Sequence, residues 1–157
     1  MNPETVNEQI LVKLLLEKFD QLVDTVNAIP AELVNSYLPV SGSNSPVQIL
    51  VHCCGMMRRW SSTVNLGIAV PRDRDAEFSA EMSKHDALNL ATDTRDAFVA
   101  DLLRTVMPEA PADLPSGREV DHWMATCGGV LLHVYEELCQ HLGHLEITRD
   151  FLCRPRT

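Results

Sequence analysis

Apolar residues recur every three or four positions along four long stretches of the chain, and this spacing predicts four amphipathic helices. We expect them at Pro3 to just before Pro30, Pro46 to about Asn65, Asp86 to Met107, and Gly128 to Leu152. No stretch shows a convincing strand alternation. The sequence therefore predicts an all-α fold, a four-helix bundle that forms a single domain over residues 1–157.

The connections are marked by proline, glycine and serine. Asn2 before Pro3 and Ser45 before Pro46 each combine a capping residue with a proline suited to the first helical position. The segment 29–44 is longer than a tight turn needs and is interpreted as a long crossover. The segment 69–84 predicts a loop over the end of the bundle, with its charges at 72–75 solvated, paired with one another or paired with a partner subunit.

The last helix carries polar side chains where an apolar surface is expected. One side of it collects Val130, Val134, Glu137, Leu138, His141, Leu145, Thr148 and Leu152. Glu137 and His141 lie near the middle of that side and are four residues apart, so they can converge on one atom. His133 and His144 flank them toward its edge.

Two interpretations of this pair are open on geometry alone. A buried carboxylate is normally paired, protonated or bound to a metal, because burying it alone costs several kcal/mol or more. Glu137 and His141 form either a satisfied ion pair or two ligands of a divalent metal, with a third ligand from another helix. His52, at the edge of the apolar side of the second helix, is not selected by geometry.

Charge and composition narrow the classes of partner. The formal charge is −9, and no lysine or arginine run occurs, so nucleic acid and anionic membrane surfaces are poor partners. A small molecule or another protein fits better. No apolar run reaches the length of a membrane span, and the acidic start lacks the basic region of a secretory signal. We expect a cytoplasmic protein.

Two further groups of residues have side chains of the kinds that bind metals. The five cysteines include no CxxC pair, which fits reduced, mostly buried thiols, although Cys53 and Cys54 follow His52 and could contribute sulfur. Glu81 and His85 repeat the four-residue spacing of the pair in the last helix. They lie where a loop joins a helix, without an apolar surface around them, and we do not expect them to bind metal.

Three stretches carry a resemblance to a known family. These are SPVQILVHCCGMMRRW in the second helix, RDRDAEF in the following loop and HVYEELCQHLGHLEITRDFL in the last helix. The chain resembles the DinB/YfiT-like superfamily of metalloenzymes, in the actinobacterial branch related to mycothiol-dependent maleylpyruvate isomerase and other thiol S-transferases. The resemblance implies an up-up-down-down bundle with a long crossover, usually dimeric, which agrees with the long segment 29–44.

The resemblance also implies a ligand set. In that family one histidine comes from the second helix, and two ligands four residues apart come from the last, Glu-x-x-x-His in the mycothiol branch. These positions fall on His52, Glu137 and His141. The superfamily often has glutamine where this chain has His144. The metal implied is divalent, zinc first and nickel second, and the assembly implied is a homodimer acting on a small molecule.

Three functions follow as hypotheses. A metal-bound low-molecular-weight thiol, of the mycothiol kind, would be held as a thiolate ready to attack an electrophilic carbon. Metal-bound water would instead make the protein a hydrolase. The third hypothesis is a bundle that binds a metal or small ligand without catalysis. His133 and His144 are the candidate catalytic residues, each able to orient a ligand or move a proton, or simply to pack as a hydrogen-bonded histidine.

Overall fold

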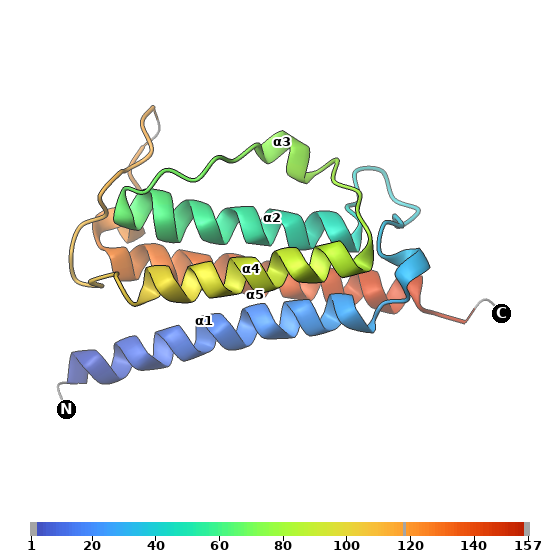
Figure 1. The fold of residues 1–157 in the computed structure, drawn as a ribbon, viewed down its shortest axis with the longest axis horizontal. Coiled ribbons are helices and arrows are strands. Elements are labelled where there is room, and N and C mark those ends of the chain that lie inside the picture. The colour runs from blue at the N-terminus through green and yellow to red at the C-terminus, as the bar shows by residue number, and fades with distance from the viewer. Residues whose placement is uncertain (1–2, 118, 156–157) are drawn as a thin grey trace.

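The computed structural model describes residues 3–117 and 119–155. Its long helices are α1 (Pro3–Ala28), α2 (Pro46–Arg58), α4 (Lys84–Leu102) and α5 (Cys127–Leu152). Shorter pieces are η1 (Ala31–Leu33), η2 (Arg59–Asn65), α3 (Arg74–Glu77) and η3 (His122–Ala125), and η2 continues α2 as a π-helix. Figure 1 shows the elements in order, with no strand in the described part of the chain. The predicted all-α bundle is confirmed.

Side-chain caps fix where the long helices begin. The Ser45 hydroxyl accepts a hydrogen bond from the Gln48 amide at 3.2 Å, and the Gln48 side chain accepts one from the Ser45 amide at 3.1 Å. This reciprocal pair is a capping box, followed by Pro46 at the first helical position. The hydroxyls of Ser83 and Thr126 cap α4 and α5 by accepting hydrogen bonds from the amides of Asp86 and Gly129. Asn2, the predicted cap of the first helix, lies outside the described residues.

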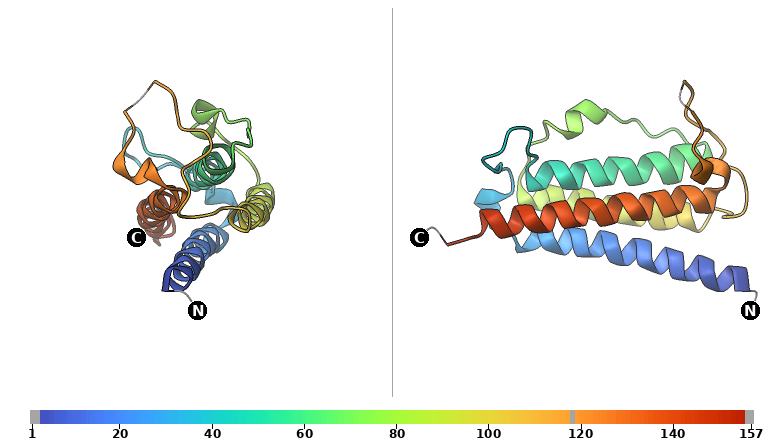
Figure 2. Two further views of the ribbon diagram at one scale, coloured as in Figure 1. Left: turned by 90° about the vertical axis from the view of Figure 1, so that its left-hand side faces the viewer. Right: turned by 180° about the vertical axis from the view of Figure 1, so that it is seen from behind.

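The four long helices pack side by side around one core. Seen end-on in Figure 2, α2 lies opposite α1, with α4 and α5 between them on either side. The core is closed by fully buried large side chains from every long helix, such as Phe19, Leu50, Phe98 and Leu138. Hydrogen bonds between charged side chains join the helices at the edges of this core. For example, Arg95 Nε donates to Asp20 Oδ1 at 2.6 Å.

The directions of the helices correct the expected topology. Figure 1 shows that α1 and α5 run one way while α2 and α4 run the other. Arg58 near the end of α2 pairs with Asp101 near the end of α4, so these two helices are parallel. The prediction of an up-up-down-down order was wrong, and so was the crossover at 29–44. Because α2 and α4 are parallel, the segment after Asn65 must travel back along the bundle before α4 begins.

That returning segment covers the outer side of α2. It contains the short helix α3, which Figures 1 and 2 show above α2 on the side away from α1. Asp73 caps α3 by accepting a hydrogen bond from the Ala76 amide at 3.0 Å. The segment is therefore a cover over the flank of α2 rather than a loop over the end of the bundle.

Two apolar surfaces are buried over a shorter length than the sequence pattern suggests. The first half of α1 presents Val6 and Ile10 at 37% and 52% exposure, because α1 extends past the core there. The helix predicted to reach Met107 ends at Leu102, and Leu103 is 85% exposed. Among the described residues, no helix has both the length and the apolar character needed to cross a bilayer.

Candidate metal centre

Two helices bring three potential metal ligands together at the border of the core. His52 comes from α2, and Glu137 and His141 come from α5. One donor atom of each residue lies within 4.8 Å of the donor atoms of the other two. No other group of three His, Cys, Asp or Glu side chains in the described residues meets this condition. The structure thus gathers the three residues that the sequence resemblance implied.

The two potential ligands from α5 face each other across one helical turn. Glu137 Oε2 lies 3.7 Å from His141 Nε2, which is beyond the distance of a normal hydrogen bond. Their side chains are 27% and 23% exposed, so they lie at the border of the core and not, as predicted, within it. Glu137 and His141 are within ion-pair distance and half-buried, so their geometry is compatible with both the ion pair and the metal ligation described above.

His52 completes the group from the facing helix. It is 5% exposed, although the sequence placed it at the edge of the apolar side of α2. Its ring lies 4.7 Å from the ring of His141, with 67° between the ring planes. Ligand atoms around a four-coordinate zinc are about 3.4 Å apart, given metal–ligand distances of about 2.1 Å. Small side-chain rotations would bring these donors to that spacing, so the residues fit a divalent ion.

A buried carboxylate that the sequence analysis missed fixes the orientation of His52. Glu77, at the end of α3, is 5% exposed, and its Oε2 atom lies 2.9 Å from His52 Nδ1. An Nδ1–H donating to this carboxylate leaves Nε2 as the nitrogen with a lone pair for a metal. A carboxylate on the far nitrogen of a ligating histidine is the arrangement found at many zinc sites.

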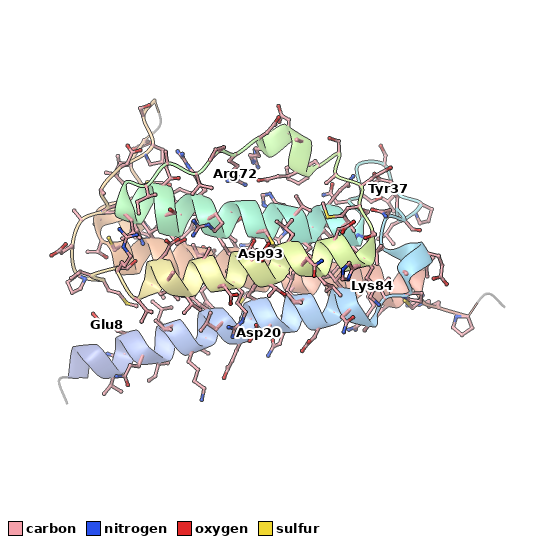
Figure 3. All side chains as sticks on the ribbon, in the orientation of Figure 1. Glu8, Asp20, Tyr37, Arg72, Lys84 and Asp93 are labelled. Carbon is pink, nitrogen blue, oxygen red and sulfur yellow. The ribbon has the colours of Figure 1, made fainter. Side chains whose placement is uncertain are left out.

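Arg72 holds that carboxylate with two hydrogen bonds. Its Nε donates to Glu77 Oε1 at 2.6 Å and its Nη2 donates to Oε2 at 2.9 Å. Figure 3 labels Arg72 in the segment that covers α2. The sequence analysis expected Arg72 to be solvated or paired with its neighbours at 73–75, and this expectation was wrong. Its partner lies five residues away, at the last residue of α3.

A glycine in α2 makes room for this pair. A Cβ atom on Gly55 would lie 2.0 Å from Glu77 Oε1 and 3.2 Å from Arg72 Nε. Real side chains do not approach this closely, so the buried pair requires glycine at this position. The glycine inside the helix and the RDRDAEF motif were the two signals in the sequence that could have located this support for His52.

Burial sets the electrostatics of the centre. Desolvation, and then the nearby His52 ring, lower the pKa of His141 below its ordinary value of 6.5, against an opposing contribution from Glu137. A neutral imidazole is the form that binds metal. Burial also raises the pKa of the Cys53 thiol well above 9.0, and that of Cys54 to about 12. Neither cysteine belongs to the donor group that the described residues form.

A cavity opens beside the centre. Its volume is about 380 Å³, and its wall includes two of the proposed ligands. The lining residues are His52, Met56, Arg59, Trp60, Arg72, Arg74, Pro115, His133 and Glu137. A pocket of this size suits a small molecule. The arrangement therefore places open space next to the donor atoms from which a metal would be held.

The two candidate catalytic histidines differ in position. His133 lines the cavity, where its ring stacks on Trp123 at 3.9 Å and meets Trp60 edge-on at 5.4 Å. Its buried Nδ1 atom has no hydrogen-bond partner among the described residues, and the nearest carboxylate, that of Glu136, is 3.6 Å away. His144 does not line this cavity, and its charge acts on His141 from the next turn of α5.

The second glutamate–histidine pair lies outside the centre. Glu81 and His85 are both exposed. The Nε2 atom of His85 makes a hydrogen bond of 3.1 Å with the Asn89 side chain. This agrees with the expectation that the repeated spacing at the start of α4 does not mark a metal site.

Comparison with known proteins identifies the family to which the chain belongs. A family model described as mycothiol-S-transferase matches residues 10–153, which is most of the chain and includes all the residues of the proposed centre. Searches among curated proteins and among solved structures gave no match. The family match agrees with the helical fold and with the resemblance noted in the sequence. The chain belongs to the mycothiol-S-transferase family, a DinB/YfiT-like family related to mycothiol-dependent enzymes.

Proposed function

We propose that the protein is a divalent-metal-dependent transferase that joins a low-molecular-weight thiol of the mycothiol type to a small electrophile. One observation supports this most strongly. The donor atoms of His52, Glu137 and His141 gather beside a cavity, and the far nitrogen of His52 is held by a buried carboxylate. Family membership supports the thiol as the nucleophile.

The three residues would hold the ion and leave one coordination position open in a four-coordinate site. Zinc suits a set of two histidines and one carboxylate, and nickel is the second choice. When bound, the ion supplies Lewis acidity, which keeps a thiol ionised at neutral pH. Glu77 would hold the His52 ring in the ligating tautomer, and Arg72 would hold the Glu77 carboxylate in place.

The other residues of the cavity would position the reactants. The thiolate sulfur forms the new C–S bond, and the leaving group departs with the electron pair of the bond it loses. In an addition reaction, the carbon next to the attacked one takes a proton instead. His133 is our candidate to supply that proton, because its ring lines the cavity together with His52 and Glu137. His144 is too far along α5 to line this cavity.

Metal content and conjugate formation test the proposal in turn. Purified protein saturated with zinc should hold about one ion per chain, and His141→Ala should hold much less. His85→Ala is the matched control, because His85 is exposed and outside the centre. Equal zinc content in the wild type and His141→Ala would refute the ligand set.

The zinc-loaded protein would then be mixed with mycothiol and 1-chloro-2,4-dinitrobenzene. The expected product is the thioether, formed with release of chloride and absent in His141→Ala. Zinc binding without conjugate from this or other electrophiles, but with hydrolysis of an ester or amide, would favour the hydrolase instead. The homodimer, the cytoplasmic location and the single domain over residues 1–157 stay predictions.

A further inference from the structure

Three arginines line the cavity beside the proposed metal centre, and only one of them has a carboxylate partner. Arg72 is bound by Glu77 through two hydrogen bonds. Among the described residues, the side chains of Arg59 and Arg74 make no hydrogen bond and no ion pair. Arg74 instead places its guanidinium 5.7 Å from the centre of the Phe78 ring. The cavity therefore holds two positive groups that the protein does not neutralise.

This lack of partners stands out in an acidic protein. The chain has 22 Asp and Glu residues against 13 Lys and Arg, so carboxylates are abundant. Arg58, the neighbour of Arg59, is paired with Asp101, and Arg95 is paired with Asp20. The carboxylate that lines the cavity is that of Glu137, whose charge a bound divalent ion would neutralise. The cavity is thus positive within a molecule of net charge −9.

We infer that Arg59 and Arg74 form a binding site for the carboxylate of the electrophilic co-substrate, so that the protein acts on small organic acids. This inference rests on the proposed function. Guanidinium groups bind carboxylates through charge-assisted, often paired hydrogen bonds. Met56, Trp60 and Pro115 supply an apolar wall for the carbon skeleton of the acid.

The spacing along α2 fits this assignment. Arg59 follows His52 by seven residues, which is two helical turns and about 10 Å along the axis. Both side chains line the same cavity. Arg59 also opens the π-helical segment η2, a kind of helix irregularity that often occurs at functional sites. An acid bound at Arg59 would extend toward the metal centre, which places an electrophilic carbon near the thiol.

Fumarate and fumaramide provide a matched pair of probes, since they share a skeleton and differ in charge. The zinc-loaded full chain would be titrated with each by calorimetry, without thiol, so that no reaction occurs. We expect fumarate to bind at least about tenfold more tightly than fumaramide. Arg59→Gln and Arg74→Gln should each weaken fumarate binding by about tenfold, at unchanged zinc content. Arg104→Gln, an exposed arginine outside the cavity, should bind fumarate like the wild type.

Several outcomes would overturn the inference. These are equal binding of the two probes, no fumarate binding at about 10 mM, or fumarate binding unchanged in both arginine variants. Repeating the titration on zinc-free protein separates this inference from the proposed function. Fumarate that still binds there and is lost in Arg59→Gln is held by the arginines and not by the ion. A protein that takes up no zinc but binds fumarate in this way would refute the metal-dependent transferase and leave the anion site standing.

Discussion

The Nδ1 atom of His52 lies 2.9 Å from the Oε2 atom of Glu77, and both residues are about 5% exposed. The two residues come from different elements, α2 and the short helix α3. The contact therefore couples the segment that covers α2 to the orientation of a proposed metal ligand. The effect of this contact on metal affinity can be measured directly.

Replacing Glu77 by alanine should weaken zinc binding by roughly 10–100-fold, the usual effect of removing a partner that orients a ligand. The reason is that the His52 ring loses the acceptor that fixes its tautomer and its angle. Zinc affinity would be measured by competition with a chromophoric chelator. Glu77→Gln should retain part of the affinity, because the amide oxygen can still accept from Nδ1–H.

The same variant leaves Arg72, 18% exposed in its side chain, without its partner, so a loss of stability is expected as well. Thermal unfolding of the zinc-free proteins separates the two effects. Glu81→Ala, in the same segment but exposed, should change neither property. Wild-type zinc affinity in a folded Glu77→Ala protein would show that Glu77 does not support the centre.

Gly55→Ala should reproduce the zinc defect without replacing any charged group. The new methyl would lie 2.0 Å from Glu77 Oε1, so the carboxylate must move away from α2 and from His52. Gly143→Ala is the matched control, since nothing lies within 4 Å of a Cβ there. As alanine favours a helix over glycine by about 1 kcal/mol, Gly143→Ala should stabilise α5. The test compares zinc affinity and the free energy of unfolding of the two variants, and equal affinity would contradict the steric argument.

The helices and the proximity of Glu137 to His141 in α5 were predictable because their signals are local. Ser45 before Pro46 marks the start of α2, and its cap is present in the structure. Glu137 and His141 meet because residues four apart face the same way on a helix. His52 was different, since its own surroundings in the sequence did not distinguish it and only the family resemblance did. Its selection needed information from beyond its own helix.

Glu77 could not be predicted because its signal is not local. It lies 25 residues after His52, in a segment whose alternating charges predict a solvated surface. Its burial depends on the close approach of α3 to Gly55, which depends on the path of the whole segment. The prediction of the helix directions was wrong for a similar reason. The length of 29–44 suggested a crossover, whereas the parallel pair α2 and α4 is joined by the segment that carries α3.

The cysteines should divide into reactive and protected groups. Cys153 is exposed and Cys139 is half-buried, while Cys53, Cys54 and Cys127 are buried. Burial raises the pKa of Cys54 to about 12, so at about pH 8 roughly one thiol in 10,000 is ionised, and only the thiolate reacts quickly. We expect Ellman's reagent to modify Cys153 first, then Cys139, and the buried three only after unfolding.

Peptide mass spectrometry would assign the sites, and Cys153→Ser should remove the fastest phase. Rapid modification of Cys53 in the folded, zinc-free protein would mean that the interior next to the metal centre opens readily. Such a result would contradict the packed core between α2 and its neighbours.

His141 should make the zinc-free protein less stable in acid. Its pKa is lowered below 6.5 in the folded state, first by burial and then by His52. Well above pH 6.5 the imidazole is neutral in both the folded and unfolded states, so it contributes no pH dependence. As the pH falls through 6.5, the unfolded chain takes up the proton first, and stability decreases until the folded state is protonated too.

Removing the His141 imidazole should therefore make the free energy of unfolding less sensitive to acid. In the presence of a chelator, His141→Asn should lose less unfolding free energy than the wild type between about pH 7.5 and about pH 5. Urea unfolding at several pH values measures this, and His85→Asn, at an exposed position, should follow the wild-type curve. Identical curves for the wild type and His141→Asn would mean that His141 is not held neutral by its surroundings. With the ordinary pKa of 6.5, a minority of His141 side chains would carry a proton near neutral pH, and metal binding would release that proton.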